Sequence, residues 1–161
     1  LEASMQSTDM YGNIMDDGVD VIIHHDTIRD DMDPAVMAMH GHNGLLHDVL
    51  HGGVGMTHAG SILGDYVMSA MSLFDVMYPA GASVGFDLTM LSRCVPGVID
   101  GIGHKAVDLT TMNIMADHIM HSWYSRMNVR GTDHRSRHCL ESEMERYRLY
   151  ADIMRALDIT S

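Results

Sequence analysis

The chain has 161 residues, 46% of them hydrophobic and 20% charged, and a formal net charge of −12. That length suits one domain with its own core, and no apolar run approaches the roughly 20 residues that span a bilayer, so we expect a single domain over residues 1–161 and no membrane partner. The acidic charge predicts no nucleic acid partner, because phosphate backbones attract Lys and Arg.

The cysteine and histidine content bears on where the protein works and on whether it binds a metal. Two cysteines are too few for a disulfide framework, and the first residues, LEASMQSTDMYGN, lack the basic and apolar regions of a secretory signal, so we expect a cytoplasmic protein. The 12 histidines include three close pairs, His24/His25, His40/His42 and His47/His51. No Cys pair or His-Glu-x-x-His run accompanies them, and we expect no bound metal.

The N-terminal part of the chain predicts one strand and one short helix. Residues 19–28, VDVIIHHDTI, are rich in β-branched side chains and predict a strand that ends at the acidic RDDMDP turn. The PAVMAMH stretch, with Pro34 in a first-turn position, predicts a short helix after that turn.

A long buried helix is predicted from Val54 to Phe74, because apolar residues recur there at three- and four-residue spacing. The repeating positions between those ends are Ala59, Ile62, Leu63, Tyr66, Val67 and Ala70. His51, Gly52 and Gly53 stand directly ahead of this helix. Glycines are poor helix formers, so their placement indicates that something approaches the backbone closely, and a ligand is one candidate.

The spacing of apolar residues changes after this helix, from every third or fourth residue to every second. In residues 82–90 apolar side chains alternate with Ser, Gly, Asp and Thr, which predicts a half-buried strand. Extended segments are predicted at about 98–109, 111–121 and 123–130, joined as an antiparallel meander because the connections are too short for crossover helices. Residues 140–158 place apolar side chains on one stripe and predict a terminal amphipathic helix.

This order of elements resembles the hot-dog fold, an α+β fold in which a curled antiparallel sheet wraps a long central helix. Three stretches are similar to small acyl-CoA thioesterases of the phenylacetate-pathway type: NGLLHDVLHGG, GASVGFDLTMLSRCVPG and VRGTDHRSRH. The resemblance implies an acyl-CoA thioesterase that works as a homodimer or homotetramer. It implies no cofactor, because coenzyme A would be present only as part of the substrate.

The resemblance also implies a site at the helix entrance. The Gly53 amide would polarise the thioester carbonyl, with His51 and Asn43 holding the thioester and water. Ser83 would position the attacking water. The unpaired amides and positive dipole end of a helix suit an oxyanion. The structural alternative is that His51 caps the chain entry and the glycines permit tight packing.

The catalytic carboxylate is the point at which the sequence departs from that family. An Asp or Glu is expected about nine residues after the motif histidine, where this chain has Gly60. Asp65 is the first carboxylate on the predicted helix and the candidate base, although at about 100° per residue it points roughly 140° away from Gly60. Gly60 also favours a further alternative, a non-catalytic acyl-CoA-binding protein of the same fold.

Three arginines, Arg130, Arg135 and Arg137, cluster near the expected final strand. We expect them to bind the phosphates of coenzyme A, since arginine forks match phosphate oxygens. The alternative is that they balance nearby acidic residues at a solvated strand end.

The chain also resembles a second family of the same fold, whose members catalyse a different reaction. VDVIIHHD and HGGVGMTHAGSILGDYV resemble (R)-specific enoyl-CoA hydratases, in which Asp and His activate water, and Asp20 and His24 would take those roles. The match is incomplete, because Asp20 lies four rather than five residues before His24 and Val-Ile replaces the expected Asn-Pro. The structural alternative is that the two residues only flank a strand.

Overall fold

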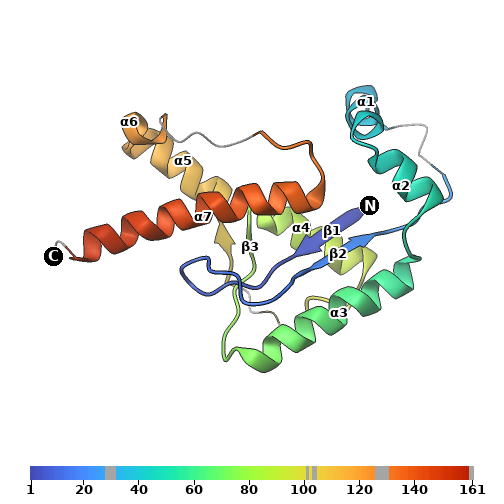
Figure 1. The fold of residues 1–161 in the computed structure, drawn as a ribbon, viewed down its shortest axis with the longest axis horizontal. Helices are drawn as coiled ribbons and strands as arrows, with labels where there is room; N and C mark the ends of the chain where they lie inside the picture. The colour runs from blue at the N-terminus through green and yellow to red at the C-terminus, as the bar shows by residue number, and fades with distance from the viewer. Residues whose placement is uncertain (28–31, 101, 103–104, 126–130, 160–161) are drawn as a thin grey trace.

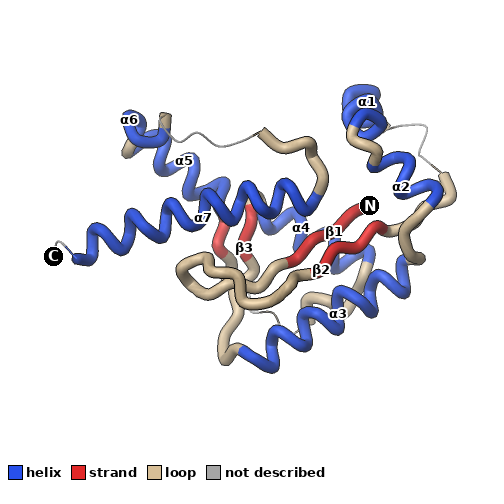
Figure 2. Tube along the Cα trace, viewed as in Figure 1, coloured by secondary structure: helices blue, strands red, loops and turns tan. Residues whose placement is uncertain are grey.

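The computed structural model describes residues 1–27, 32–100, 102, 105–125 and 131–159, and helices dominate this part of the chain (Figure 1, Figure 2). The helices are α1 Pro34–His42, α2 Leu45–His51, α3 Met56–Leu73, α4 Val84–Cys94, α5 Leu109–Ile119, α6 His121–Tyr124 and α7 Ser136–Ile159. The strands are β1 Glu2–Met5, β2 Val19–Ile22, β3 Ala80–Gly81 and β4 Val107–Asp108.

Strands β1 and β2 form an antiparallel hairpin that lies between α3 and α7 (Figure 1). Across the pair, Ser4 faces Asp20 and Glu2 faces Ile22. One core cluster fills the α3 side of the hairpin, and its buried residues are Val21, Ile23, Ala59, Leu63, Val67, Val95 and Val98. Burying a side chain of Val or Leu size contributes about 1.5–3 kcal/mol, so this cluster fixes α3 against β2.

Both elements predicted in the N-terminal part are present. The expected strand is β2, which is shorter than the predicted 19–28, and the expected short helix is α1. Asp33 caps α1, because its Oδ1 accepts hydrogen bonds from the amides of Ala35 at 2.7 Å and Val36 at 3.4 Å. Pro34 occupies the first helical position, where its missing amide proton breaks no helical bond.

The predicted long helix is α3, and its buried face follows the predicted spacing. Ala59 and Leu63 are fully buried, and Val67 and Ala70 are nearly so. Gly60 lies next to this face, where an added side-chain carbon would meet Val95 at an ordinary van der Waals distance. The three- and four-residue recurrence of apolar residues therefore predicted this helix correctly.

His51, Gly52 and Gly53 close α2 and lead toward α3. Gly53 has a φ of 77°, and a side-chain carbon there would lie 2.6 Å from the carbonyl oxygen of Ile22. The following amide, of Val54, donates to that same oxygen at 2.9 Å. The close approach indicated by the glycines is therefore made by the backbone of β2, and glycine is the residue that fits it without strain.

The predicted half-buried strand over residues 82–90 is wrong, because most of this segment is helix α4. Val84, Leu88 and Leu91 also satisfy the helical period: Val84 is buried, and Leu91 packs on the first core cluster. Phe86, which the alternating pattern placed inward, is 69% exposed. A run this short fits both periods, so periodicity alone did not separate helix from strand.

The predicted antiparallel meander is also wrong. The segment predicted as a strand at 111–121 is mostly helix α5, and β4 pairs in parallel with β3. Leu109, Met112 and Ala116 recur at helical spacing and pack against Tyr150 of α7 in a second core cluster. The segment predicted at 123–130 begins in α6, and its residues 126–130 lie outside the described part.

The hot-dog fold class is wrong, because each sheet in the described part of the chain has two strands and none curls around α3. The expected C-terminal helix is present as α7, which begins four residues earlier than predicted. The Tyr147 hydroxyl and Arg148 Nε of α7 donate to the carbonyls of Met10 and Gly12, which holds the β1–β2 connection against this helix. The single domain over residues 1–161 remains a prediction.

The length and apolar character of a helix decide whether it can cross a bilayer. Crossing its apolar core takes roughly 20 predominantly apolar residues in one helix. Among the described residues, no helix combines the necessary length with the necessary apolar character.

Candidate functional site

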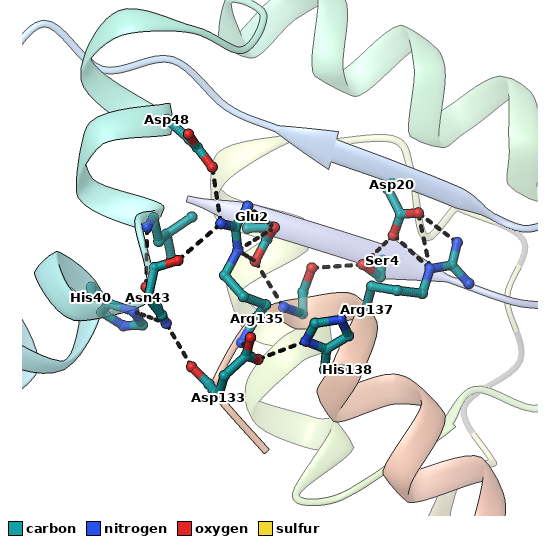
Figure 3. A network of polar contacts seen from close by, with 12 residues as sticks. Glu2, Ser4, Asp20, His40, Asn43, Asp48, Asp133, Arg135, Arg137 and His138 are labelled. Carbon is teal, nitrogen blue, oxygen red and sulfur yellow. Dashed lines mark hydrogen bonds and ion pairs between the residues drawn. The ribbon is translucent and has the colours of Figure 1, made fainter.

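Polar side chains from the β1–β2 hairpin and from α1, α2 and α7 converge where α7 begins (Figure 3). Arg135, directly before α7, donates from Nε and Nη2 to the Glu2 carboxylate of β1 at 2.9–3.2 Å. Glu2 Oε2 also accepts a hydrogen bond from the Ser136 amide at 2.8 Å, one of the amides that a helix start leaves unpaired. Glu2 is therefore both the counter-ion of Arg135 and a cap for α7.

Arg135 also ties this centre to the first two helices. Its Nη1 donates to Asp48 Oδ2 of α2 at 2.9 Å and to the Asn43 carbonyl at the end of α1 at 3.2 Å. The hydrogen bond from Arg135 lowers the pKa of the Asp48 carboxyl, and the bonds to Glu2 and Asp48 raise the pKa of the guanidinium. Asn43 completes the link by donating from Nδ2 to the Asp133 carbonyl at 2.7 Å.

Arg137, in the first turn of α7, forms a second bridge to the hairpin. Its Nε and Nη2 donate to the Asp20 carboxylate of β2 at 2.7–3.0 Å, and its Nη1 donates to Gln6 at 3.3 Å. The Ser4 hydroxyl donates to Asp20 Oδ1 at 2.5 Å. Desolvation alone would raise the pKa of Asp20, but the hydrogen bonds from Arg137 and Ser4 outweigh it and lower that pKa.

A pocket opens beside these bridges, with Asp133 and His138 in its wall. His138 Nδ1 lies 2.8 Å from Asp133 Oδ1, which also accepts the Arg135 amide at 3.0 Å. The Arg135 amide and the His138 ring lower the pKa of Asp133, and the Asp133 carboxylate raises the pKa of His138. A carboxylate at Nδ1 orients the ring and leaves Nε2 as the atom that can exchange a proton with a ligand.

The rest of the pocket lining is polar and acidic, and consists of Gly131, Thr132, Glu141, Ser142 and Glu145. Glu141 and Glu145 follow His138 at three- and four-residue spacing, which places the three side chains on one face of α7. Such a wall can both donate and accept protons. Within residues 1–27, 32–100, 102, 105–125 and 131–159, no group of three or more His, Cys, Asp or Glu side chains is arranged to hold a metal ion.

The structure does not place Gly53 and His51 at a helix entrance. Helix α3 begins at Met56 with Gly55 as its N-cap, so the Gly53 amide lies before the helix and outside its first turn. His51 ends α2, where its Nδ1 bonds to the His47 carbonyl at 3.0 Å and its ring stacks on that of His47, with centroids 4.7 Å apart. The unpaired amides of α3 therefore do not include that of Gly53.

The other residues predicted around a thioester lie on separate elements. Asp65 is exposed on α3, and Ser83 precedes α4, where its hydroxyl lies 3.1 Å from that of Thr110. Asn43 ends α1 and belongs to the network around Arg135. The structure therefore brings Asn43 to one of the predicted arginines, but not to Asp65 or Ser83 by any described hydrogen bond.

The arginines predicted to bind coenzyme A serve their own chain where they are described. Arg130 lies outside the described residues, and Arg135 and Arg137 are paired with carboxylates. This arrangement agrees with the alternative that the arginines balance nearby acidic residues. Asp20, from the hydratase alternative, is the partner of Arg137 and shares no described hydrogen bond with His24.

Glu2, Asp133 and His138 were not predicted as site residues. Asp133 had a local signal, because a Thr-Asp pair shortly before an amphipathic helix is typical of a helix start. Glu2 had none, since its partner Arg135 lies 133 residues further along the chain.

Comparisons with known proteins give a consistent set of relatives, although no protein-family model matches the chain. The chain is 27% identical over 155 residues to the oligoribonuclease of Mycobacterium leprae (strain TN), which covers 93% of this chain and 70% of the relative. It is 27% identical over 128 residues to the oligoribonucleases of Mycobacterium sp. (strain KMS) and Nocardia farcinica (strain IFM 10152). Those matches cover 79% of this chain and 58% and 57% of the relatives, so the chain spans less than two thirds of their length.

These relatives overturn the resemblance to hot-dog acyl-CoA thioesterases, and with it the acyl-CoA substrate. The three stretches behind that resemblance are short and permissive, whereas the similarity to an oligoribonuclease runs through 155 residues.

The expectation of no nucleic acid partner conflicts with the relatives as well. An acidic net charge repels nucleic acids in proportion to their phosphates, so it argues against long nucleic acids more strongly than against a short oligonucleotide. The relatives are named as hydrolytic enzymes, which agrees with the coarser expectation of a hydrolase.

Proposed function

We propose that this chain hydrolyses phosphodiester bonds in short RNA. The observation that carries the proposal is the similarity to oligoribonucleases, which in one relative extends over 93% of the chain. The proposal keeps the expected class of reaction, hydrolysis, and replaces a thioester with a phosphodiester. The relatives' name describes the activity of their whole chains. The matches with this chain cover 57–70% of the relatives' length.

The acidic composition is compatible with a short RNA substrate. Repulsion between the protein and RNA grows with the number of phosphates, and an oligonucleotide of a few residues carries few of them. Arg135 and Arg137, which lie between the pocket residues Asp133 and His138 in the sequence, are neutralised by Glu2, Asp48 and Asp20. We therefore expect weak electrostatic attraction and recognition through bases and sugars as well as phosphates.

His138 is the residue we assign to proton transfer. Asp133 holds its Nδ1, as a carboxylate does for a catalytic histidine, and this hydrogen bond raises the pKa of the ring. In the proposed step water attacks phosphorus and the bond from phosphorus to the leaving ribose oxygen breaks. His138 Nε2 gives its proton to that oxygen, and Glu141, in the same wall, accepts the proton of the attacking water.

Many nucleases place divalent metal ions at the scissile phosphate. The donor set does not fit such an ion in the described residues, where no three His, Cys, Asp or Glu side chains converge. We therefore assign no step to a metal. The proposed chemistry is limited to what His138, Asp133 and Glu141 can do as proton donors and acceptors.

Hydrolysis is tested by incubating the purified chain with an RNA trinucleotide and separating the products by chromatography. We expect shorter RNA products from the parent chain and a loss of about 100-fold or more in rate for His138→Gln, because general acid–base groups commonly contribute that much. His118→Gln is the matched control, since His118 is exposed on α5 and bonds only locally, to the Ile114 carbonyl, in the described chain. Intact RNA with the folded parent chain would refute the proposed function.

A further inference from the structure

The parallel pairing of β3 and β4 brings the starts of two helices to one edge of the molecule. Ala80 pairs with Val107 and Gly81 with Asp108. Helix α5 begins directly after β4, and α4 begins at Val84, shortly after β3. The hydroxyls of Ser83 and Thr110, one from each helix start, lie 3.1 Å apart. Ligands of α/β proteins commonly bind outside the carboxyl ends of parallel strands, where such loops meet.

An aromatic ring stands on this edge. Phe86, in the first turn of α4, is 69% exposed, compared with 54% for Tyr11 and 43% for Tyr78. Burying a phenylalanine side chain contributes about 1.5–3 kcal/mol, so leaving one in water forgoes a considerable stabilisation. Val84, two residues earlier, is buried and anchors the same turn. The ring is therefore presented to solvent from a helix whose other face is packed.

The backbone at Ser83 fixes the direction in which this turn leaves β3. Ser83 has φ 54° and ψ 37°, a left-handed conformation that costs a residue with a side chain about 1 kcal/mol or more. Its carbonyl accepts the Phe86 amide at 2.8 Å, so the strained residue and the aromatic residue belong to one hydrogen-bonded turn. The position of Phe86 is thus held by the backbone.

The surroundings of Phe86 select the kind of partner. Its exposed neighbours along the helix are Gly85, Asp87 and Thr89, and an added side-chain carbon at Gly85 would meet open space. A protein helix or a lipid surface needs a broad apolar patch, whereas the exposed neighbours of Phe86 along α4 are small or polar. A single flat ring with polar groups beside it suits a nucleobase, whose face stacks on an aromatic side chain and whose sugar is polar.

We infer that Phe86 stacks on a base of the oligoribonucleotide substrate, with the Ser83 and Thr110 hydroxyls beside that nucleotide. This inference rests on the proposed function, because it takes short RNA as the ligand. Stacking does not depend on which base is present, so the contact would favour nucleotides in general over a particular sequence. It places one substrate contact at the edge shared by α4 and α5.

The test measures binding of two probes of equal charge: a phosphorothioate-linked adenosine trinucleotide and the same trinucleotide with its bases removed. Phe86→Ala should weaken binding of the adenosine probe by about five- to 150-fold, the range of one base–aromatic stack, and should leave the abasic probe unchanged. Phe86→Trp should retain or tighten binding of the adenosine probe. Met68→Ala is the matched control, because Met68 is 64% exposed on α3, and it should bind both probes as the parent does.

The outcomes separate this inference from the proposed function. If the parent chain cleaves RNA and Phe86→Ala binds the adenosine probe as tightly as the parent, the stacking role is refuted and the hydrolase proposal stands. If Phe86→Ala weakens both probes equally, the residue acts on the fold or on phosphates, and stacking is again refuted. If the folded parent neither binds nor cleaves RNA, both proposals fail.

Discussion

Glu2 of β1 accepts hydrogen bonds from Nε and Nη2 of Arg135, which lies 133 residues later in the chain. The pair is largely shielded from water, with 11% of the Glu2 side chain and 21% of the Arg135 side chain exposed. Removing one partner of a shielded pair leaves the other charge unpaired, which costs more than losing an exposed pair. The attachment of α7 to the hairpin therefore depends on Arg135.

Replacing Arg135 with Gln is expected to lower the free energy of unfolding by about 2 kcal/mol or more. Arg93→Gln is the matched control, because Arg93 is exposed in the last turn of α4 and makes no ion pair that the structure describes. An exposed arginine near a helix end contributes at most about 1 kcal/mol. Urea unfolding followed by circular dichroism measures both variants, and equal losses would contradict the structural role of Arg135.

Alanine substitutions at two glycines are expected to change stability in opposite directions. Gly53→Ala should lower the free energy of unfolding by more than about 1 kcal/mol, because of its positive φ and the carbonyl of Ile22. Gly64→Ala should raise it by about 0.5–1 kcal/mol, since Gly64 lies within α3 and faces open space. Thermal unfolding compares the two. A Gly53→Ala chain as stable as the parent would show that tight packing does not require this glycine.

The Asp133–His138 pair should give a pH dependence that is visible in the histidine titration. The pKa of His138 is raised above 6.5, so the contribution of its protonated form to stability is complete below pH 6.5 and disappears as the pH rises through the folded-state pKa. The pKa of Asp133 is lowered below 3.8, so its contribution is present above pH 3.8 and disappears as the pH falls through the folded-state pKa. NMR titration of the His138 ring measures the first shift. Asp133→Asn should return it toward 6.5, and an unchanged pKa in that variant would show that Asp133 is not its cause.

Because the chain has a net charge of −12, we expect it to hydrolyse short RNA faster than long RNA. Initial hydrolysis rates on a trinucleotide and on an RNA of about 24 nucleotides can be compared at low and high salt. Repulsion grows with the number of phosphates and is screened by salt, so the preference for the trinucleotide should narrow as salt is added. A preference that does not change with salt would rule out charge repulsion as its origin.

Local sequence patterns correctly predicted the elements whose pattern fits only one kind of secondary structure. The recurrence in α3, the Pro34 start of α1 and the stripe of α7 are of this kind. Residues 82–90 were misassigned because Val84 and Leu88 satisfy both an alternating and a helical period, and the packing that separates the two is not local. The same limit applies to the site. Arg135 was recognised as a candidate anion-binding residue, but its partners Glu2 and Asp48 come from distant parts of the chain.

The most direct test of the RNA assignment is mass spectrometry of one reaction that contains the purified chain, an RNA trinucleotide and an acyl-CoA ester. The relatives are oligoribonucleases, so we expect the trinucleotide to be converted to shorter nucleotides while the thioester stays intact. The assignment would be contradicted if the full-length trinucleotide were recovered while circular dichroism shows the chain to be folded. This holds whether or not the thioester is cleaved.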